Sequence, residues 1–171
     1  MNKIKEKFKR IKMRSFLLVG FIAVLWVILS LLSPHFMTIS NIMLLLQQSS
    51  IVMVAGIGMT FAILTSGIDL SIGSVAALAS VVMGITITNW GFPVPVALIL
   101  GLLTGTVFGT LNGILISYFK LQPMVCTLGV MSIARGLTYI FTSGRSIFVT
   151  DSFLIKIGSG RLMGIPIIAI I

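Results

Sequence analysis

Charge is the property that this sequence has least of. Only 9% of its 171 residues are charged, while 57% are hydrophobic and the mean hydropathy is +1.19. Soluble globular domains carry about 25% charged residues. Between Ser15 and Lys120 the one formally charged side chain is Asp69. Because so few polar side chains cannot cover a surface that faces water, the composition excludes a soluble domain and predicts an integral membrane protein.

Residues that carry catalytic, metal or redox chemistry are also scarce. The chain has one cysteine, Cys126, one histidine, His35, and three acidic residues. A single cysteine excludes a disulfide framework and a thiolate metal site. The sequence contains no P-loop, no nucleophile–base pair and no paired carboxylates. We therefore expect no enzymatic activity, no bound metal and no cofactor.

Basic residues gather at the N-terminus, where residues 1–14 hold seven of the twelve. Cytoplasmic flanks of membrane helices carry excess Lys and Arg, so the segment is predicted to be a basic cytoplasmic tail. A dense basic segment can also bind nucleic acid or begin a signal peptide. The apolar run Ser15–Leu32 is longer than a signal-peptide core and no A-x-A cleavage site follows it. We interpret it as a retained span, with a tail that contacts anionic lipid and not nucleic acid.

Apolar runs of about 20 residues predict the membrane spans. Five complete runs occur, over residues 15–32, 41–65, 69–88, 95–118 and 123–144. They predict an all-α transmembrane bundle over residues 15–171. Residues 145–164 are more polar and form an expected outer loop, in which "SIFVT" has the composition of a short strand. Residues 165–171 begin a sixth span that is too short to cross the bilayer, so we expect the front part of a longer protein.

The stretch "TSGIDLSIGSV" places Asp69 between the second and third spans. Gly67 suits the end of one helix, and Asp69 suits the N-cap of the next. The same turn could line the inner mouth of a pathway, because irregular polar backbone is tolerated where water reaches it. Both roles remain open for Asp69 and its neighbour Ser71.

Small residues predict close helix packing. The fourth span carries glycines at a spacing of four residues, which lie on one helix face, and the third span contributes Gly73. Small residues let membrane helices approach closely, and Asn112 beside the stripe could bridge helices by hydrogen bonds. The stripe consists of Gly101, Gly105, Gly109 and Gly113.

Two further polar features lie inside predicted spans. Arg135 is about midway along the fifth span, where a charge costs at least about 2.5–3.5 kcal/mol on insertion scales and should face protein or water. It either forms a structural pair, with a helix-end carbonyl, a carboxylate from a missing segment or Asp69, or contacts a pathway or substrate. Gln47 and Gln48 form a polar step in the second span, which indicates a helix that lines a pathway.

Several longer strings resemble one family. "TSGIDLSIGSVAALASVV", "LQPMVCTLGVMSIARGLTYIFTSGRSI", "FVTDSFLIKIGSGRLMGIP" and "TISNIMLLLQQSSIVMVAGIGMTFAIL" together cover nearly all of the chain beyond the basic tail. They closely resemble sugar-type ABC transporter permeases, the ribose, xylose, galactose and autoinducer-2 group. The resemblance implies a monosaccharide-import subunit of the bacterial inner membrane with the fold of the first half of a type II importer permease. Members of that family are nearly twice as long.

The resemblance also implies partners. These are a second permease subunit in a dimer, cytoplasmic ATP-binding subunits that hydrolyse ATP, and a periplasmic sugar-binding protein. Two other readings of the residues remain open: a stand-alone small channel or secondary transporter, and a membrane fragment that transports nothing.

Overall fold

The computed structural model describes residues 2–65, 67–162 and 164–170. These residues form two compact units, Met1–Gln47 and Gln48–Ile171. Each unit is described by itself below.

The first unit is a helical hairpin. Helix α1 (Asn2–Leu32) ends just before Pro34, as expected because proline disfavours helical backbone at the residue before it. The helix includes the basic segment that the sequence predicts as a tail. Helix α2 (Ile39–Leu64) begins after a short turn and continues into the second unit. The turn is held by Trp26, whose indole N–H donates to Met37 Sδ at 3.3 Å and whose ring meets Phe36 edge-on at 5.2 Å.

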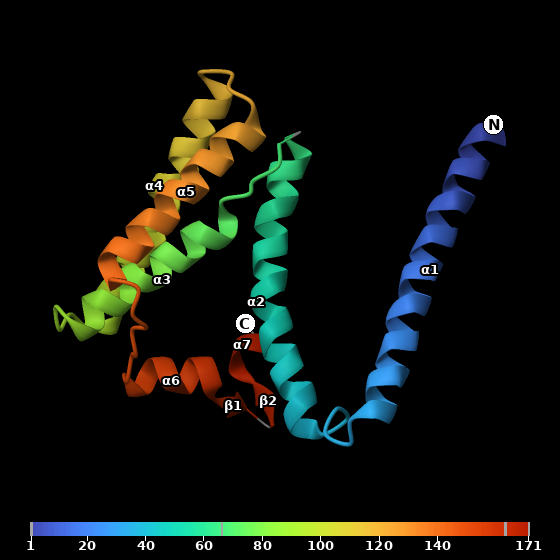
Figure 1. Cartoon of the computed structure of the whole chain (residues 1–171), viewed down its shortest axis with the longest axis horizontal. Helices are drawn as coiled ribbons and strands as arrows, with labels where there is room; N and C mark the ends of the chain where they lie inside the picture. The colour runs from blue at the N-terminus through green and yellow to red at the C-terminus, as the bar shows by residue number, and fades with distance from the viewer. Residues whose placement is uncertain (1, 66, 163, 171) are drawn as a thin grey trace. The chain divides into compact units, whose positions relative to one another are not determined.

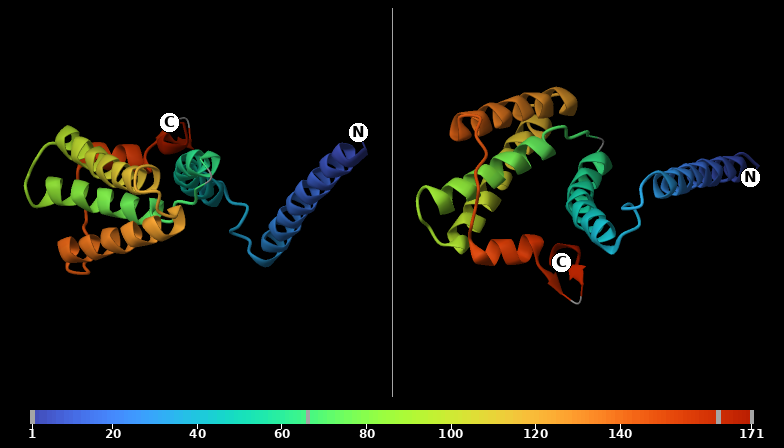
Figure 2. Two further views of the ribbon diagram at one scale, coloured as in Figure 1. Left: turned by 90° about the horizontal axis from the view of Figure 1, so that it is seen from above. Right: turned by 60° about the horizontal axis from the view of Figure 1, so that its bottom comes forward.

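The second unit is built around a bundle of three helices, α3 (Ile72–Thr88), α4 (Val94–Ser117) and α5 (Pro123–Thr142) (Figure 1). The three helices pack against one another, as the two views of Figure 2 show. Both α4 and α5 have a proline in their first turn. Proline suits this position because backbone N–H groups in the first turn form no hydrogen bond within the helix, so the N–H that proline lacks is not needed. The residues that the bundle buries are mostly small, including Ala97, Cys126, Val130 and Ala134.

The expected glycine contacts occur at one position of the stripe. A Cβ at Gly101 would lie 2.6 Å from Met83 Cγ and Sδ, so the Met83 side chain of α3 occupies the space that a side chain at position 101 would need. A Cβ at Gly105, Gly109 or Gly113 would meet no heavy atom within 4 Å, and the same holds at Gly73 on α3. A packing role for these four glycines therefore stays a prediction.

The segment after α5 runs back over α3. A Cβ at Gly84 would lie 3.0 Å from Ile147 Cγ2, so residues 145–149 pass directly over this helix. They have no regular secondary structure and pair with no strand in the part of the chain that is described, so the short strand expected at "SIFVT" is wrong. These residues lie against a helix surface, which offers no free backbone groups for a ladder.

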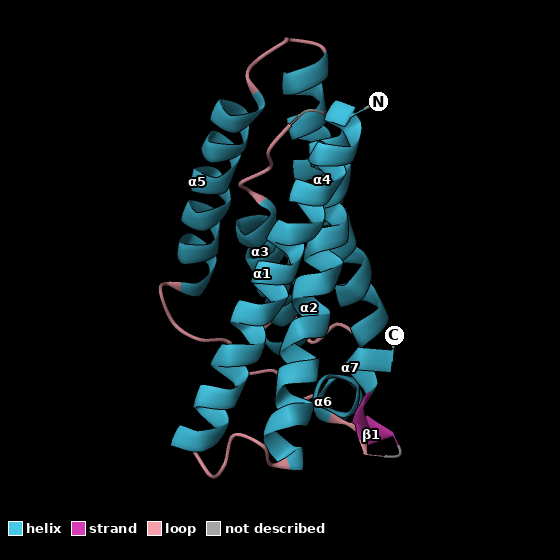
Figure 3. Ribbon diagram, turned by 90° about the vertical axis from the view of Figure 1, so that its right-hand side faces the viewer, coloured by secondary structure: helices cyan, strands magenta, loops and turns pink. Residues whose placement is uncertain are grey.

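Three small elements follow. Helix α6 (Ser152–Ser159) is capped by Asp151, whose carboxylate accepts from the backbone N–H groups of Phe153 at 2.9 Å and Leu154 at 3.2 Å. Strands β1 (Arg161–Leu162) and β2 (Ile165–Pro166) then pair antiparallel, and helix α7 (Ile167–Ile170) follows (Figure 3). The predicted sixth span thus starts as a strand, and its helix begins only at Ile167.

The described chain has three helices that are long and apolar enough to cross a membrane: α2, α4 and α5. Phe16–Leu32 and α3 are apolar but shorter. The 17 residues of α3 extend about 25 Å, against about 30 Å of hydrocarbon. The helical, multi-pass character is confirmed, whereas a count of five complete spans is not.

A leucine at position 101 should destabilise the bundle, because it would displace the Met83 side chain from its place between α3 and α4. Overpacking of this kind costs about 1–3 kcal/mol. We expect Gly101→Leu to lower the unfolding midpoint of the detergent-solubilised chain, followed by circular dichroism. Gly105→Leu, on the same face of α4 but in open space, is the matched control. Equal midpoints for the two variants would contradict the close contact at Gly101.

Candidate functional site

The turn between α2 and α3 carries the most distinctive sequence of the chain. Gly67 ends α2 by donating its backbone N–H to the carbonyl of Ala62 at 2.9 Å, a closing bond that spans five residues. A Cβ at Gly67 would lie 3.5 Å from Pro123 Cβ, so this glycine also contacts the start of α5. The turn is therefore packed onto the start of α5 at Gly67.

Asp69 does not cap α3 as predicted. Helix α3 begins at Ile72 with Ser71 as its N-cap, and the Ser71 side chain makes no cap bond to the helix. The Asp69 carboxylate instead accepts two hydrogen bonds from Ser71, from the backbone N–H at 2.8 Å and from the hydroxyl at 2.6 Å. An aspartate that bonds the backbone two residues on forms an Asx turn, and this local bond replaces the bonds to the helix end.

Two side chains from other helices hold this turn. Asn112 of α4 donates through Nδ2 to Ser71 Oγ at 3.0 Å. The Thr127 hydroxyl of α5 lies 3.1 Å from the Ile68 carbonyl oxygen and 2.9 Å from the Pro123 carbonyl oxygen, so it shares its hydrogen between the turn and its own helix. Ser71, Asn112 and Thr127 are all buried, at 1%, 5% and 1% exposure. We call Asp69, Ser71, Asn112 and Thr127 the turn network.

The turn network is not fully satisfied. Asn112 Oδ1 is buried and has no hydrogen-bond partner among the residues that the structure describes. The orientation of the Asn112 side-chain amide is nevertheless determined. The Ser71 hydroxyl donates its hydrogen to Asp69, so it can only accept a hydrogen bond from Asn112, which must point its NH₂ group toward Ser71. A cavity of about 420 Å³ adjoins the turn and is lined by Asp69, Asn112 and Thr127 among others. Asn112 thus forms a hydrogen bond beyond its own helix, to the N-cap residue Ser71 in the turn before α3.

Arg135 belongs to a second site, between α3 and α5. Its Nε donates to Ser74 Oγ at 3.1 Å. Asp69 is engaged by Ser71 and Arg135 by Ser74, so the two charged residues have different partners. Arg135 lines a cleft of about 760 Å³ that extends along α3 and α5 to the segment after α5.

The structure does not unite all of the predicted pathway residues. Asp69, Ser71 and Asn112 share the turn network, while Arg135 lies in the α3–α5 cleft. Gln47 and Gln48 lie on α2 at the division between the two units, Gln47 half-buried and Gln48 exposed.

Two residues of these sites were missed from the sequence. Thr127 and Ser74 are the contacts that α5 and α3 contribute, and both are ordinary hydroxyl residues within apolar runs. Periodicity could have found the cleft face, because Arg135, Thr138 and Thr142 recur at intervals of three and four residues on α5. Nothing in the sequence indicates that Thr127 reaches the turn 59 residues earlier.

Comparisons with known protein families and sequences match this chain to transport permeases. Residues 39–158 match a family described as the permease component of the branched-chain amino acid transport system. The ribose import permease protein RbsC of Haemophilus influenzae is 35% identical over 161 residues, which cover 92% of this chain and 49% of that protein. No solved structure matches the chain.

Two other relatives agree with this result. The ribose import permease protein RbsC of Escherichia coli K12 is 37% identical over 84% of this chain and 46% of its own length. The autoinducer 2 import system permease protein LsrC of Photorhabdus luminescens is 36% identical over 69% of this chain and 35% of its own length. The chain thus spans about half the length, or less, of these curated relatives.

Removing the Ser71 hydroxyl should cost stability, because it leaves Asp69 without one bond and the buried Asn112 amide without its acceptor. An unsatisfied buried polar group costs about 1–3 kcal/mol. We expect Ser71→Ala to lower the unfolding midpoint in detergent. The double variant Ser71→Ala/Asn112→Leu should recover part of the loss, because it removes the unpaired amide.

Ser132→Ala is the control, since this exposed hydroxyl bonds only within its own helix. Purely additive losses for Ser71→Ala and Asn112→Leu would show that the two side chains do not interact.

Proposed function

The chain belongs to the permease family that its residues 39–158 match, and on this premise we propose that it forms part of the translocation pathway of an ABC importer for monosaccharides. The observation that carries the proposal is the turn network, in which the family-like "GIDLS" turn is held by one side chain from α4 and one from α5. The relatives named for ribose and autoinducer 2 import support sugar-like cargo.

The turn network suits a pathway because it holds a non-helical stretch of polar backbone in a fixed position. Non-helical backbone at membrane depth is tolerated where it is buried in protein or lines a water-filled cavity. Buried hydrogen bonds tie the turn to two helices, while Asp69 stays only partly buried beside a cavity. A wall with these properties can offer polar groups to a solute without unfolding. In this proposal Gln47, Gln48, Asp69, Ser71, Asn112 and Arg135 contribute to the pathway.

The rest of the assembly follows from this assignment. The proposed partners are a second permease subunit, ATP-binding subunits in the cytoplasm and a periplasmic sugar-binding protein. The permease would itself hydrolyse no ATP, and residues 15–171 would form its membrane domain. Neither the turn network nor the α3–α5 cleft specifically favours a stand-alone channel.

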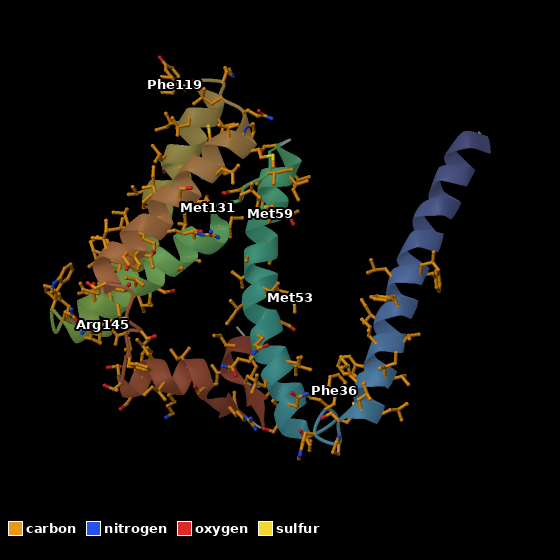
Figure 4. All side chains as sticks on the ribbon, viewed as in Figure 1. Phe36, Met53, Met59, Phe119, Met131 and Arg145 are labelled. Carbon is orange, nitrogen blue, oxygen red and sulfur yellow. The ribbon has the colours of Figure 1, made fainter. Side chains whose placement is uncertain are left out.

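We place the protein in the bacterial inner membrane with its N-terminus, including the basic residues 1–14, in the cytoplasm. The distribution of basic residues supports this orientation. Lys120, between α4 and α5, then lies inside, while Arg145, Lys156 and Arg161 lie outside. Phe119 and Arg145 lie at opposite ends of the three-helix bundle, which agrees with opposite membrane sides (Figure 4).

Cysteine labelling in intact cells tests the orientation. Cys126 is replaced by serine first, and then Lys120→Cys or Arg161→Cys is added. We expect a membrane-impermeant maleimide to label the cysteine at 161 in intact cells and the one at 120 only after lysis. The reverse pattern would contradict the orientation but not the family.

A chimera tests the function. The matching segment of the Escherichia coli ribose import permease, 37% identical over 147 residues, is replaced by the residues of this chain. We expect the chimera to restore ribose uptake to cells that lack the native permease, and Asp69→Ala in the chimera to lower uptake about tenfold through loss of a charge-assisted hydrogen bond.

Thr106→Val is the matched control, since Thr106 is exposed on α4 and its hydroxyl bonds only its own helix. A chimera present in the membrane at normal amounts that takes up no ribose would refute the proposed function.

A further inference from the structure

The cleft between α3 and α5 holds a cationic side chain beside several hydroxyls. Its volume of about 760 Å³ is within the range of small-molecule sites. Its polar lining includes Ser74, Ser80, Arg135, Thr138, Thr142 and Arg145. We propose that this cleft binds a neutral polyol such as a monosaccharide directly. The proposal rests on the proposed function and assigns it a substrate-contact site.

Arg135 supplies fixed donors in the cleft. Its hydrogen bond to Ser74 uses Nε, and Ser74 is itself buried at 7% exposure. This bond holds one edge of the guanidinium against α3. The side chain is otherwise exposed, and among the described residues Ser74 is its hydrogen-bond partner. The four remaining N–H groups of the guanidinium are available to a ligand.

The hydroxyls of the cleft act mainly as acceptors. Ser80 donates its hydrogen to the Ala76 carbonyl at 2.9 Å, and Thr138 donates to the Ala134 carbonyl at 2.8 Å. Each hydroxyl oxygen keeps lone pairs that a ligand can bond. The cleft therefore presents donors and acceptors together. A sugar hydroxyl both donates and accepts, so it matches this mixture, whereas a carboxylate only accepts and would leave the hydroxyl oxygens unmatched.

The two acidic side chains that the structure describes lie outside this site. Of the described acidic side chains, Asp69 is bonded to Ser71 and Asp151 caps α6. A charged side chain within a span is expensive unless it meets protein, water or a polar ligand. A hydrated cleft that admits a polyol supplies that environment for Arg135.

The cleft also opens at a suitable place. Arg145 lines it near the end of the bundle opposite Phe119 (Figure 4). In the proposed orientation this is the periplasmic end, where a binding protein would release sugar. Tyr139, which also lines the cleft, adds an apolar ring face for the C–H groups of a sugar.

Binding of D-ribose to the full chain in lipid nanodiscs tests the proposal, measured by saturation-transfer NMR. We expect transfer to ribose protons with a dissociation constant of about 1–10 mM, in keeping with a site that must release its ligand. Arg135→Gln should weaken binding about tenfold by removing charged donors. Thr138→Val should also weaken ribose binding. Because this substitution keeps the shape of the side chain, it tests the cleft even if Arg135→Gln fails to fold.

Ser132→Ala and Thr106→Val are the matched controls, because both residues bond only their own helix carbonyls and lie outside the cleft. No transfer, or equal transfer to all variants, would overturn the proposal. Displacement of ribose by sodium acetate at equal concentration would also overturn it, in favour of a carboxylate partner. If the chain binds no ribose but the chimera still imports it, the proposed binding site in the cleft is refuted and the proposed function is not. If ribose binds in the cleft but the chimera is inactive, the binding site is supported and the proposed function is contradicted.

Discussion

The hydrogen bonding of the turn before α3 is the constraint on which the second unit depends. A chain that leaves helical geometry within a membrane bundle exposes backbone groups that lipid cannot satisfy. Here Asp69 satisfies Ser71, Asn112 reaches Ser71 from α4, and Thr127 reaches the Ile68 carbonyl from α5. The same few bonds therefore close the turn and join three helices at one end.

Small side chains make this arrangement possible. In lipid, helices gain little hydrophobic free energy by meeting, so close backbone contact and hydrogen bonds supply much of the association. Gly101 admits Met83 between α3 and α4, and Gly84 admits Ile147 from the segment after α5. Many large apolar side chains remain exposed, among them Leu102, Val107 and Ile140, as expected for surfaces that meet lipid or other helices.

The two polar sites of the second unit have different physical characters. The turn network is buried except at Asp69, and most of its polar groups are hydrogen-bonded, which suits a fixed wall. The α3–α5 cleft is open and keeps unsatisfied donors and acceptors around Arg135. A membrane subunit that moves a polar solute needs both properties: rigid helix contacts, and polar groups that a passing ligand can bond briefly.

The sequence by itself determined the membrane character, the family resemblance and most helix limits, because apolar run length and proline positions act locally. Expected runs of 41–65 and 95–118 correspond to α2 at Ile39–Leu64 and α4 at Val94–Ser117. The sequence also singled out Asp69, Asn112 and Arg135, since polar side chains are costly in lipid. It could not decide that Asp69 would bond Ser71 and leave the end of α3 uncapped, because an aspartate at this position can bond nearby backbone N–H groups either as an Asx turn or as an N-cap. Only the tertiary structure decided that Thr127 meets the turn, that Arg135 meets Ser74, and that Gly101 alone of the stripe is in contact, since each depends on how helices distant in sequence approach one another.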